Sequence, residues 1–208
     1  PGQLIGIVAP ASPPNELEAI RFAIDTIESL GFRVRPAAHL FDRSGYLAGD
    51  DAARAADLNE LFADESVDAI FCLRGGYGSS RLLPLLDFER MRANPKVLLG
   101  YSDITSLLLS IFHKTGLVTF HGPIAAQTIT PYTLAEFKKV LLDPQPPVRI
   151  AAPPPFERGE GRVEKENRIT PLVSGKVQGR LLGGNLSLVS HLVGTPYMPD
   201  LSGAILFL

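Results

Sequence analysis

The sequence predicts an α/β protein in which a mostly parallel sheet is flanked by helices and is followed by the beginning of a second, smaller domain. Two observations carry this prediction. Short apolar runs alternate along the chain with segments whose apolar residues recur at helical spacing, a pattern typical of parallel strands joined by helices. A proline-rich and charged segment then interrupts the alternation, and regular patterning resumes only near Val173.

The first elements follow from apolar patterning and from the residues that end each run. In order, we expect a strand at 4–9, a helix at 16–30, a strand at 32–35, a helix at 51–62 and a strand at 67–73. The first of these strands is apolar throughout and the last is apolar apart from Asp68, as in strands buried on both faces. Asn15 is a candidate N-cap for the first helix, and Gly31 ends it.

The later elements continue the alternation up to residue 142. We expect a short helix near 80–86, a strand at 97–99, a helix at 103–114, a strand at 117–121 and a helix at 133–142. Six prolines between 143 and 156 then favour a stiff, extended connector. Beyond it we expect a strand at 175–182 and a short helix at 185–192. We therefore expect an α/β domain at 1–145, a linker at 146–170 and the start of a C-terminal domain at 171–208.

Composition limits the function classes. With 208 residues, of which 45% are hydrophobic, the chain can bury one sizeable core. A net charge of -2 makes neither nucleic acid nor an anionic membrane an evident partner, and no apolar run approaches the roughly 20 residues that span a bilayer. The single Cys72 excludes an internal disulfide framework and favours a cytoplasmic protein. We expect Cys72 itself to be a buried packing residue within its strand. No histidine and acid spacing suits a metal, so we expect neither metal nor cofactor.

The run that ends at Gly100 has the pattern of a nucleophile elbow. An apolar strand stops at Gly100, Ser102 follows two residues later, and a helical pattern begins at Ile104. A serine on such a turn is held clear of the sheet, with the first helical amides nearby. Ile104 stands where G-x-S-x-G has its second glycine. The alternative interpretation is that Ser102 is only a helix N-cap.

A second loop, Arg74-Gly75-Gly76-Tyr77-Gly78-Ser79-Ser80, follows another buried strand. Its glycines can turn tightly and present bare amides to a ligand. One interpretation is a phosphate or dinucleotide loop, although G-x-G-x-x-G is only half matched. The other is an oxyanion hole made by the amides of Asp103 and Gly76, with Gly75 as the alternative.

Four further residues are candidates for the site. Arg74 follows a buried strand, where it can bind a substrate carboxylate or pair with Asp103 or another acid. Tyr77 can lie against substrate or close its own loop. Asn185 is an N-cap by default, although the preceding glycine pair keeps side chains away from some neighbour. His121 ends an expected strand, and we favour a structural role for it over that of a base for Ser102.

Five motifs in order resemble those of the LD-carboxypeptidases (muramoyltetrapeptide carboxypeptidases) and the related microcin-immunity hydrolases. The motifs, which cover essentially the whole chain, are Arg74-Gly-Gly-Tyr-Gly-Ser-Ser-Arg-Leu-Leu, Gly100-Tyr-Ser-Asp-Ile-Thr, His121-Gly-Pro, Gly179-Arg-Leu-Leu-Gly-Gly-Asn-Leu and Gly194-Thr-Pro. The resemblance implies a class I glutaminase-like N-terminal domain and a serine peptidase that acts as a homodimer. Such enzymes remove the terminal D-alanine of murein tetrapeptides in cell-wall recycling.

The resemblance also implies a Ser-Glu-His triad, with Ser102 as nucleophile. The family's glutamate follows the strand matched by residues 203–208, and its histidine lies well beyond that strand. We therefore expect both residues to lie outside this chain. On this interpretation the chain is part of a longer protein, and residues 1–208 alone are inactive. The alternative is a nucleotide- or ligand-binding α/β module that uses the glycine loop without catalysis.

Overall fold

The computed structural model describes residues 2–123, 129–152, 158–159, 162–163 and 170–208. Contacts divide the chain into two compact units, residues 1–127 with 179–208 and residues 128–178. Residues 179–208 thus pack with the α/β unit, although some 50 residues separate them from it in sequence. The predicted domain boundaries at 145 and 170 stay a prediction.

The first unit is built on a five-stranded parallel sheet with the order β2-β1-β3-β4-β5. Its strands are β1 (Leu4–Val8), β2 (Arg33–Pro36), β3 (Ala69–Cys72), β4 (Val97–Gly100) and β5 (Phe120–His121). Every residue of β3 is buried, as expected for an apolar strand at the centre of a sheet covered on both faces. The predicted α/β class with a parallel sheet is confirmed.

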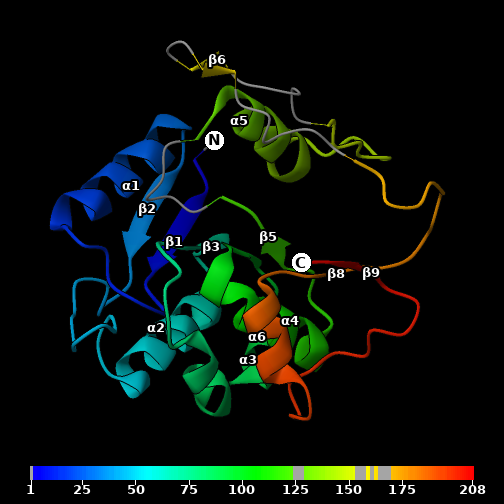
Figure 1. Ribbon diagram of the computed structural model, residues 1–208. Helices are drawn as coiled ribbons and strands as arrows, with labels where there is room; N and C mark the ends of the chain where they lie inside the picture. Colours follow the sequence, from blue (N-terminus) through cyan, green and yellow to red (C-terminus); the bar gives the residue numbers. More distant parts are fainter. Residues whose placement is uncertain (1, 124–128, 153–157, 160–161, 164–169) are drawn as a thin grey trace. The chain divides into compact units, whose positions relative to one another are not determined.

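Helices cover both faces of this sheet. They are α1 (Leu17–Ser29), α2 (Asp51–Ala63), η1 (Ser79–Leu85), α3 (Phe88–Ala93), η2 (Ser102–Ile104), α4 (Thr105–Thr115) and α6 (Leu186–Leu192). Right-handed crossovers place α1 on one face and α2, α3 and α4 on the other, because the strand order reverses direction after β2. Figure 1 shows α1 apart from α2, α3, α4 and α6, which lie together.

The main core lies between the sheet and the helices α2 to α4. It includes Phe62, Ile70, Leu98 and Leu107, all with at most 1% of their surface exposed. Leu182, Val189 and Leu192 join the same core, so the segment that carries α6 packs on the α/β unit. Beside it, β8 (Leu181–Gly183) and β9 (Ile205–Phe207) form a parallel pair.

The second unit contains α5 (Pro131–Phe137), which continues as a π-helical turn over Lys138–Leu142. Thr130 caps α5 with its hydroxyl, and Pro131 occupies the first turn, where its missing amide costs no hydrogen bond. Two short strands, β6 (Arg158–Gly159) and β7 (Arg162–Val163), pair antiparallel. Prolines 153–155 of the predicted connector lie outside the described residues.

Several boundaries differ from the sequence predictions. Only Phe120 and His121 of the strand expected at 117–121 pair with β4, and only Leu181–Gly183 forms a strand near 175–182. The helix expected near 80–86 is a 3₁₀ helix that contains Pro84, a residue that cannot complete α-helical hydrogen bonds. The short helix α3 was not predicted. None of the described helices has the length and apolar character needed to cross a membrane.

Candidate functional site

The site lies where the loops after β1, β3 and β4 meet at the carboxyl edge of the sheet. The connection from β1 leads to β2 on one side of it, whereas the connection from β2 leads back past β1 to β3 on the other side. The strand order therefore changes direction between β1 and β3, and these two strands flank the topological switch point. Ligands of open α/β sheets bind in the crevice at such a point. The loops here carry Ser12 after β1, the glycine loop (74–80) after β3 and the elbow (100–104) after β4.

Ser102 occupies a strained turn between β4 and the first helical residues. Its φ is 60°, and it is the one described residue other than glycine with a positive φ. Because such a backbone costs roughly 1–3 kcal/mol, it persists where surrounding contacts impose it, which is common at active sites. The side chain is half-buried, and its hydroxyl makes no hydrogen bond to any residue that the structure describes. The turn has the form expected of a nucleophile elbow.

The departure from G-x-S-x-G has a packing explanation. A Cβ placed on Gly100 would lie 2.7 Å from Cγ2 of Ile104. Gly100, the last residue of β4, has no side chain, and the Ile104 side chain occupies the space next to it. Gly100 thus leaves room for Ile104 close to the end of β4.

The glycine loop approaches the elbow at Gly75. A Cβ on Gly75 would lie 3.1 Å from Cβ of Ser102 and 3.3 Å from the amide nitrogen of Asp103. The Asp103 amide lies in the first turn of η2, where helical amides have no acceptor within the helix. The Gly76 amide follows Gly75 directly, so both glycine amides lie within one peptide unit of this contact.

Ser12, which was not singled out from the sequence, supports the other side of the glycine loop. Its hydroxyl accepts a hydrogen bond from the Tyr77 amide (3.1 Å), and its amide donates to the Gly75 carbonyl (3.3 Å). A Cβ on Gly76, which has a φ of 116°, would lie 2.4 Å from the Ser12 hydroxyl. Glycine is required there both for its conformation and for the room it leaves. The sequence feature that could have identified Ser12 is its hydroxyl in the loop after the first strand, at the same edge of the sheet as the glycine loop.

Hydrogen bonds of two buried residues, Ser79 and Arg54, hold the glycine loop against its neighbours. The Ser79 amide donates to Oδ2 of Asp103 (2.9 Å), and the Ser79 hydroxyl donates to the Asp103 carbonyl (2.6 Å). Arg54, with 1% of its surface exposed, donates to the carbonyls of Pro10 and Gly78 and pairs with Asp51. Burial lowers the pKa of the Arg54 guanidinium, and the Asp51 carboxylate opposes that change.

Arg74 does not pair with Asp103. Its guanidinium donates to the Pro13 carbonyl (2.8 Å) and to Oδ1 of Asn15 (3.2 Å), while the Asp103 carboxylate accepts from Ser79. Asn15 is consequently not the cap of α1; Glu16 holds that position without a side-chain hydrogen bond. A substrate contact for Arg74 stays a prediction.

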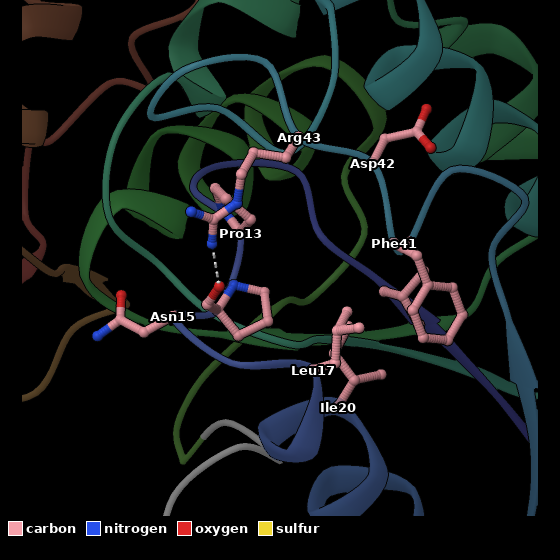
Figure 2. Close-up of a pocket in the computed structure, with 9 residues that line it drawn as sticks. Pro13, Asn15, Leu17, Ile20, Phe41, Asp42 and Arg43 are labelled. Atoms are coloured by element: carbon pink, nitrogen blue, oxygen red, sulfur yellow. Dashed lines mark hydrogen bonds between the residues drawn. The ribbon is translucent and has the colours of Figure 1, made fainter.

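A cavity of about 170 Å³ adjoins the loop after β1, which carries Pro13 and Asn15 (Figure 2). Leu17, Ile20 and Phe41 form an apolar side, and the Arg43 guanidinium donates to the Pro14 carbonyl (2.7 Å). The loops after β1 and β2 thus line a hollow at the carboxyl edge of the sheet, on the far side of β1 from the elbow.

Tyr77 and Asn185 are both accessible. The Tyr77 ring is 56% exposed and meets the Tyr46 ring edge to face at 5.5 Å. Asn185 caps α6, because its side chain accepts from the Leu188 amide (3.3 Å), which confirms the default interpretation. The preceding glycine makes room for Thr105: a Cβ on Gly184 would lie 2.4 Å from the Thr105 hydroxyl, which accepts from the Asn185 amide. This contact reaches the first residue of α4, directly behind the elbow.

His121 packs by its ring against Tyr101 (6.2 Å) and Phe207 (5.2 Å), at the end of β5. The residue is exposed, and the atoms that surround its ring lower the pKa of His121 by desolvation. Cys72 is fully buried at the end of β3, and burial raises the pKa of its thiol, so it is a packing residue as predicted. Among the described residues no three histidine, cysteine or acidic side chains gather as a metal site.

Fold and site together define a doubly wound α/β protein with a serine held on a strand-to-helix turn against a glycine loop. The chain belongs to the LD-carboxypeptidase family: the N-terminal domain of that family matches residues 5–122, and its C-terminal domain matches residues 178–208.

Named relatives agree with this assignment. The chain is 39% identical to a probable murein peptide carboxypeptidase of Bacillus subtilis (strain 168), covering 100% of the chain and 62% of the relative. It is 32% identical to the microcin C7 self-immunity protein MccF of Escherichia coli (100% and 66%) and 33% identical to the murein tetrapeptide carboxypeptidase of Pseudomonas aeruginosa (92% and 60%). The chain therefore spans about two thirds or less of the length of these relatives.

Solved structures with the same fold include an MccF-like protein from Bacillus anthracis, with a TM-score of 0.84, 32% identity, and coverage of 99% of this chain and 66% of the other. The microcin C7 self-immunity protein MccF in complex with aspartyl sulfamoyl adenosine has a TM-score of 0.81 and 29% identity, with coverage of 99% and 68%.

Proposed function

We propose that the protein is a serine carboxypeptidase that removes the terminal D-alanine from murein tetrapeptides by cutting the bond between an L-centre and a D-centre. The observation that carries the proposal is the contact of Gly75 with Ser102 and the Asp103 amide. It joins a strained serine to backbone amides at the carboxyl edge of a parallel sheet, which is the geometry required for attack on a carbonyl. The names of the murein carboxypeptidase relatives support the substrate class.

In the proposed reaction, Ser102 Oγ attacks the carbonyl carbon of the penultimate residue, the L-centre of diaminopimelate or lysine. The negative charge that develops on the carbonyl oxygen accepts hydrogen bonds from the Asp103 amide and from the amide of Gly76 or Gly75. Collapse of the intermediate forms an ester on Ser102 and releases D-alanine, which takes up a proton. Water then cleaves the ester. One such donor contributes about 3–4 kcal/mol to transition-state stabilisation in comparable enzymes.

The remaining assignments are proposals that rest on family resemblance. The family implies that a histidine oriented by a glutamate accepts the Ser102 proton, and we assign neither role to a residue of 1–208. Arg74, Tyr77 and Asn185 are proposed substrate contacts, a homodimer is the proposed assembly, and the cytoplasm with its murein recycling is the proposed setting.

A second candidate substrate is an aminoacyl sulfamoyl nucleoside. It is favoured by the close match to MccF, which has been solved in complex with aspartyl sulfamoyl adenosine. The same elbow and glycine loop would serve the cleavage of either substrate, since both require attack on a carbonyl by Ser102. Turnover of one substrate but not the other decides between them.

The test is Ser102→Ala in the complete gene product, with release of D-alanine from a murein tetrapeptide as the readout. We expect a loss of at least about 10⁴-fold in kcat with the fold retained. Ser110→Ala is the matched control, because Ser110 is fully buried on α4 and its hydroxyl has no partner among the described residues. Retention of more than about a hundredth of the activity in Ser102→Ala would show that another residue is the nucleophile.

A further inference from the structure

We propose that Ser79 and the carboxylate of Asp103 are positioning residues that set the place of the glycine-loop amides relative to the Asp103 amide. The inference rests on the proposed function, because it concerns the geometry of the oxyanion donors. It assigns a role to two side chains that themselves touch no reacting atom.

Two hydrogen bonds join the two residues, and Ser79 is the donor in both. The Ser79 amide donates to Oδ2 of Asp103 (2.9 Å), and the Ser79 hydroxyl donates to the backbone carbonyl of Asp103 (2.6 Å). Ser79 has none of its surface exposed and Asp103 has 3%. A hydrogen bond to a carboxylate is about twice as strong as one between neutral groups, and its loss in a buried place leaves an unsatisfied charge. The pair therefore has one well-determined arrangement.

Ser106 extends the contact into α4. The hydroxyl oxygens of Ser79 and Ser106 lie 2.7 Å apart, and the Ser106 hydroxyl also donates to the Asp103 carbonyl (3.2 Å). Ser106 is fully buried. One residue of the glycine loop is thus held by both the elbow and the helix that follows it, although 24 residues separate Ser79 from Asp103.

The position of this contact gives it a consequence for catalysis. Ser79 belongs to the same loop as Gly75 and Gly76, and Asp103 supplies the other proposed donor. Donors must lie within about 2.7–3.1 Å of the developing oxyanion, and a misplacement of about 1 Å can cost 10²-fold in rate. If the hydrogen bonds between Ser79 and Asp103 are removed, the two sets of amides lose their fixed separation while the rest of the substrate site is unchanged.

The experiment measures kcat and KM for Ser79→Ala, Ser110→Ala, Asp103→Asn and Asp103→Ala in the complete gene product. Both the murein tetrapeptide and aspartyl sulfamoyl adenosine are offered as substrates, well below the unfolding temperature of each variant. We expect Ser79→Ala to lower kcat about 10- to 100-fold with KM changed less than about twofold. Ser110→Ala removes an equally buried hydroxyl and should leave both constants unchanged.

The two Asp103 variants test whether the hydrogen bond from the Ser79 amide, when it is kept, also preserves kcat. Asparagine keeps an oxygen that can accept from the Ser79 amide, and alanine does not, so we expect kcat to fall in the order wild type, Asp103→Asn, Asp103→Ala. A purely structural role would lower the unfolding free energy of these variants without this order in kcat.

The activity of the wild type tests the proposed function, and the activities of the variants test the positioning role. If the wild type turns over neither substrate, the proposed function fails and the positioning role falls with it. If the wild type is active and Ser79→Ala retains its kcat, or Ser110→Ala loses as much, the positioning role alone is overturned.

Discussion

Gly75 lies so close to Ser102 that a methyl group on the glycine would come within 3.1 Å of the serine Cβ. The contact joins the loops after two adjacent parallel strands, β3 and β4, at the edge where each strand ends. It explains why the loop needs glycine at a position whose φ is not positive: the limit is space, set by the neighbouring elbow.

Gly75→Ala should therefore impair catalysis more than stability. The added methyl group would displace Ser102 and the Asp103 amide by a few tenths of an ångström, so we expect kcat to fall about 10- to 100-fold. The unfolding free energy should fall by about 1–2 kcal/mol, as for moderate overpacking. Gly175→Ala is the control, because a Cβ there meets nothing within 4 Å and its φ is not positive. Unchanged kcat in Gly75→Ala would contradict the proposed site.

Arg54→Met should destabilise the protein far more than Arg81→Met. Both arginines pair with Asp51, but Arg54 has 1% of its side chain exposed and Arg81 has 49%. Loss of Arg54 leaves the carbonyls of Pro10 and Gly78 without their buried donor, at a cost of about 2–4 kcal/mol. Loss of the exposed pair should cost far less, because solvent and salt screen an exposed ion pair. Urea unfolding of both variants measures the difference, and equal losses would refute it.

His39 should make stability depend on pH. A hydrogen bond to the buried Asp57 (2.8 Å), together with its charge, raises the pKa of His39 above 6.5, and Asp42 and Glu60 add to the effect. Burial raises the pKa of Asp57 itself, despite His39. Because the folded state holds the His39 proton more tightly, its stabilisation is complete below pH 6.5 and is lost as pH rises through the folded pKa.

The measurement is unfolding free energy between pH 5.5 and 8.5 for the wild type and His39→Gln. The wild type should lose more stability over this range, by less than about 1 kcal/mol because the His39 side chain is 39% exposed. Parallel curves for the two proteins would show that His39 does not contribute.

Asn185 variants separate its capping role from its proposed contact with substrate. Asn185→Ala removes the N-cap of α6 and should cost about 1 kcal/mol, whereas Asn185→Asp keeps an acceptor for the Leu188 amide and should retain most of the stability. Because aspartate lacks the amide donors, a KM raised severalfold in Asn185→Asp would support substrate contact. An unchanged KM in both variants would leave Asn185 with the cap alone.

The prediction from sequence succeeded where local pattern governs structure. Alternating apolar runs and helical periodicity were enough for the parallel sheet, and the residues around Gly100 were enough for the turn that holds Ser102. Buried strands and a strand-to-helix turn are encoded within about ten consecutive residues, so one segment read by itself reveals them.

It failed where a side chain has its partner far away in the chain. Asn15 has the sequence position of a helix cap, yet it accepts from Arg74, 59 residues away. Arg54 falls in an alanine-rich helix and would pass for a surface residue, but it is buried against two loop carbonyls. Competing partners of similar chemistry cannot be ranked without their positions.

The sequence by itself therefore determined the fold class, the turn at Ser102 and the glycine loop, because backbone preferences and apolar periodicity act over short distances. Only the tertiary structure decided that Gly75 contacts Ser102, that the Asp103 side chain binds Ser79 rather than Arg74, and that Gly184 makes room for Thr105. These contacts join residues that are 24 to 79 positions apart. Their geometry follows from the strand order and from close packing of the core, neither of which any single segment of the sequence specifies.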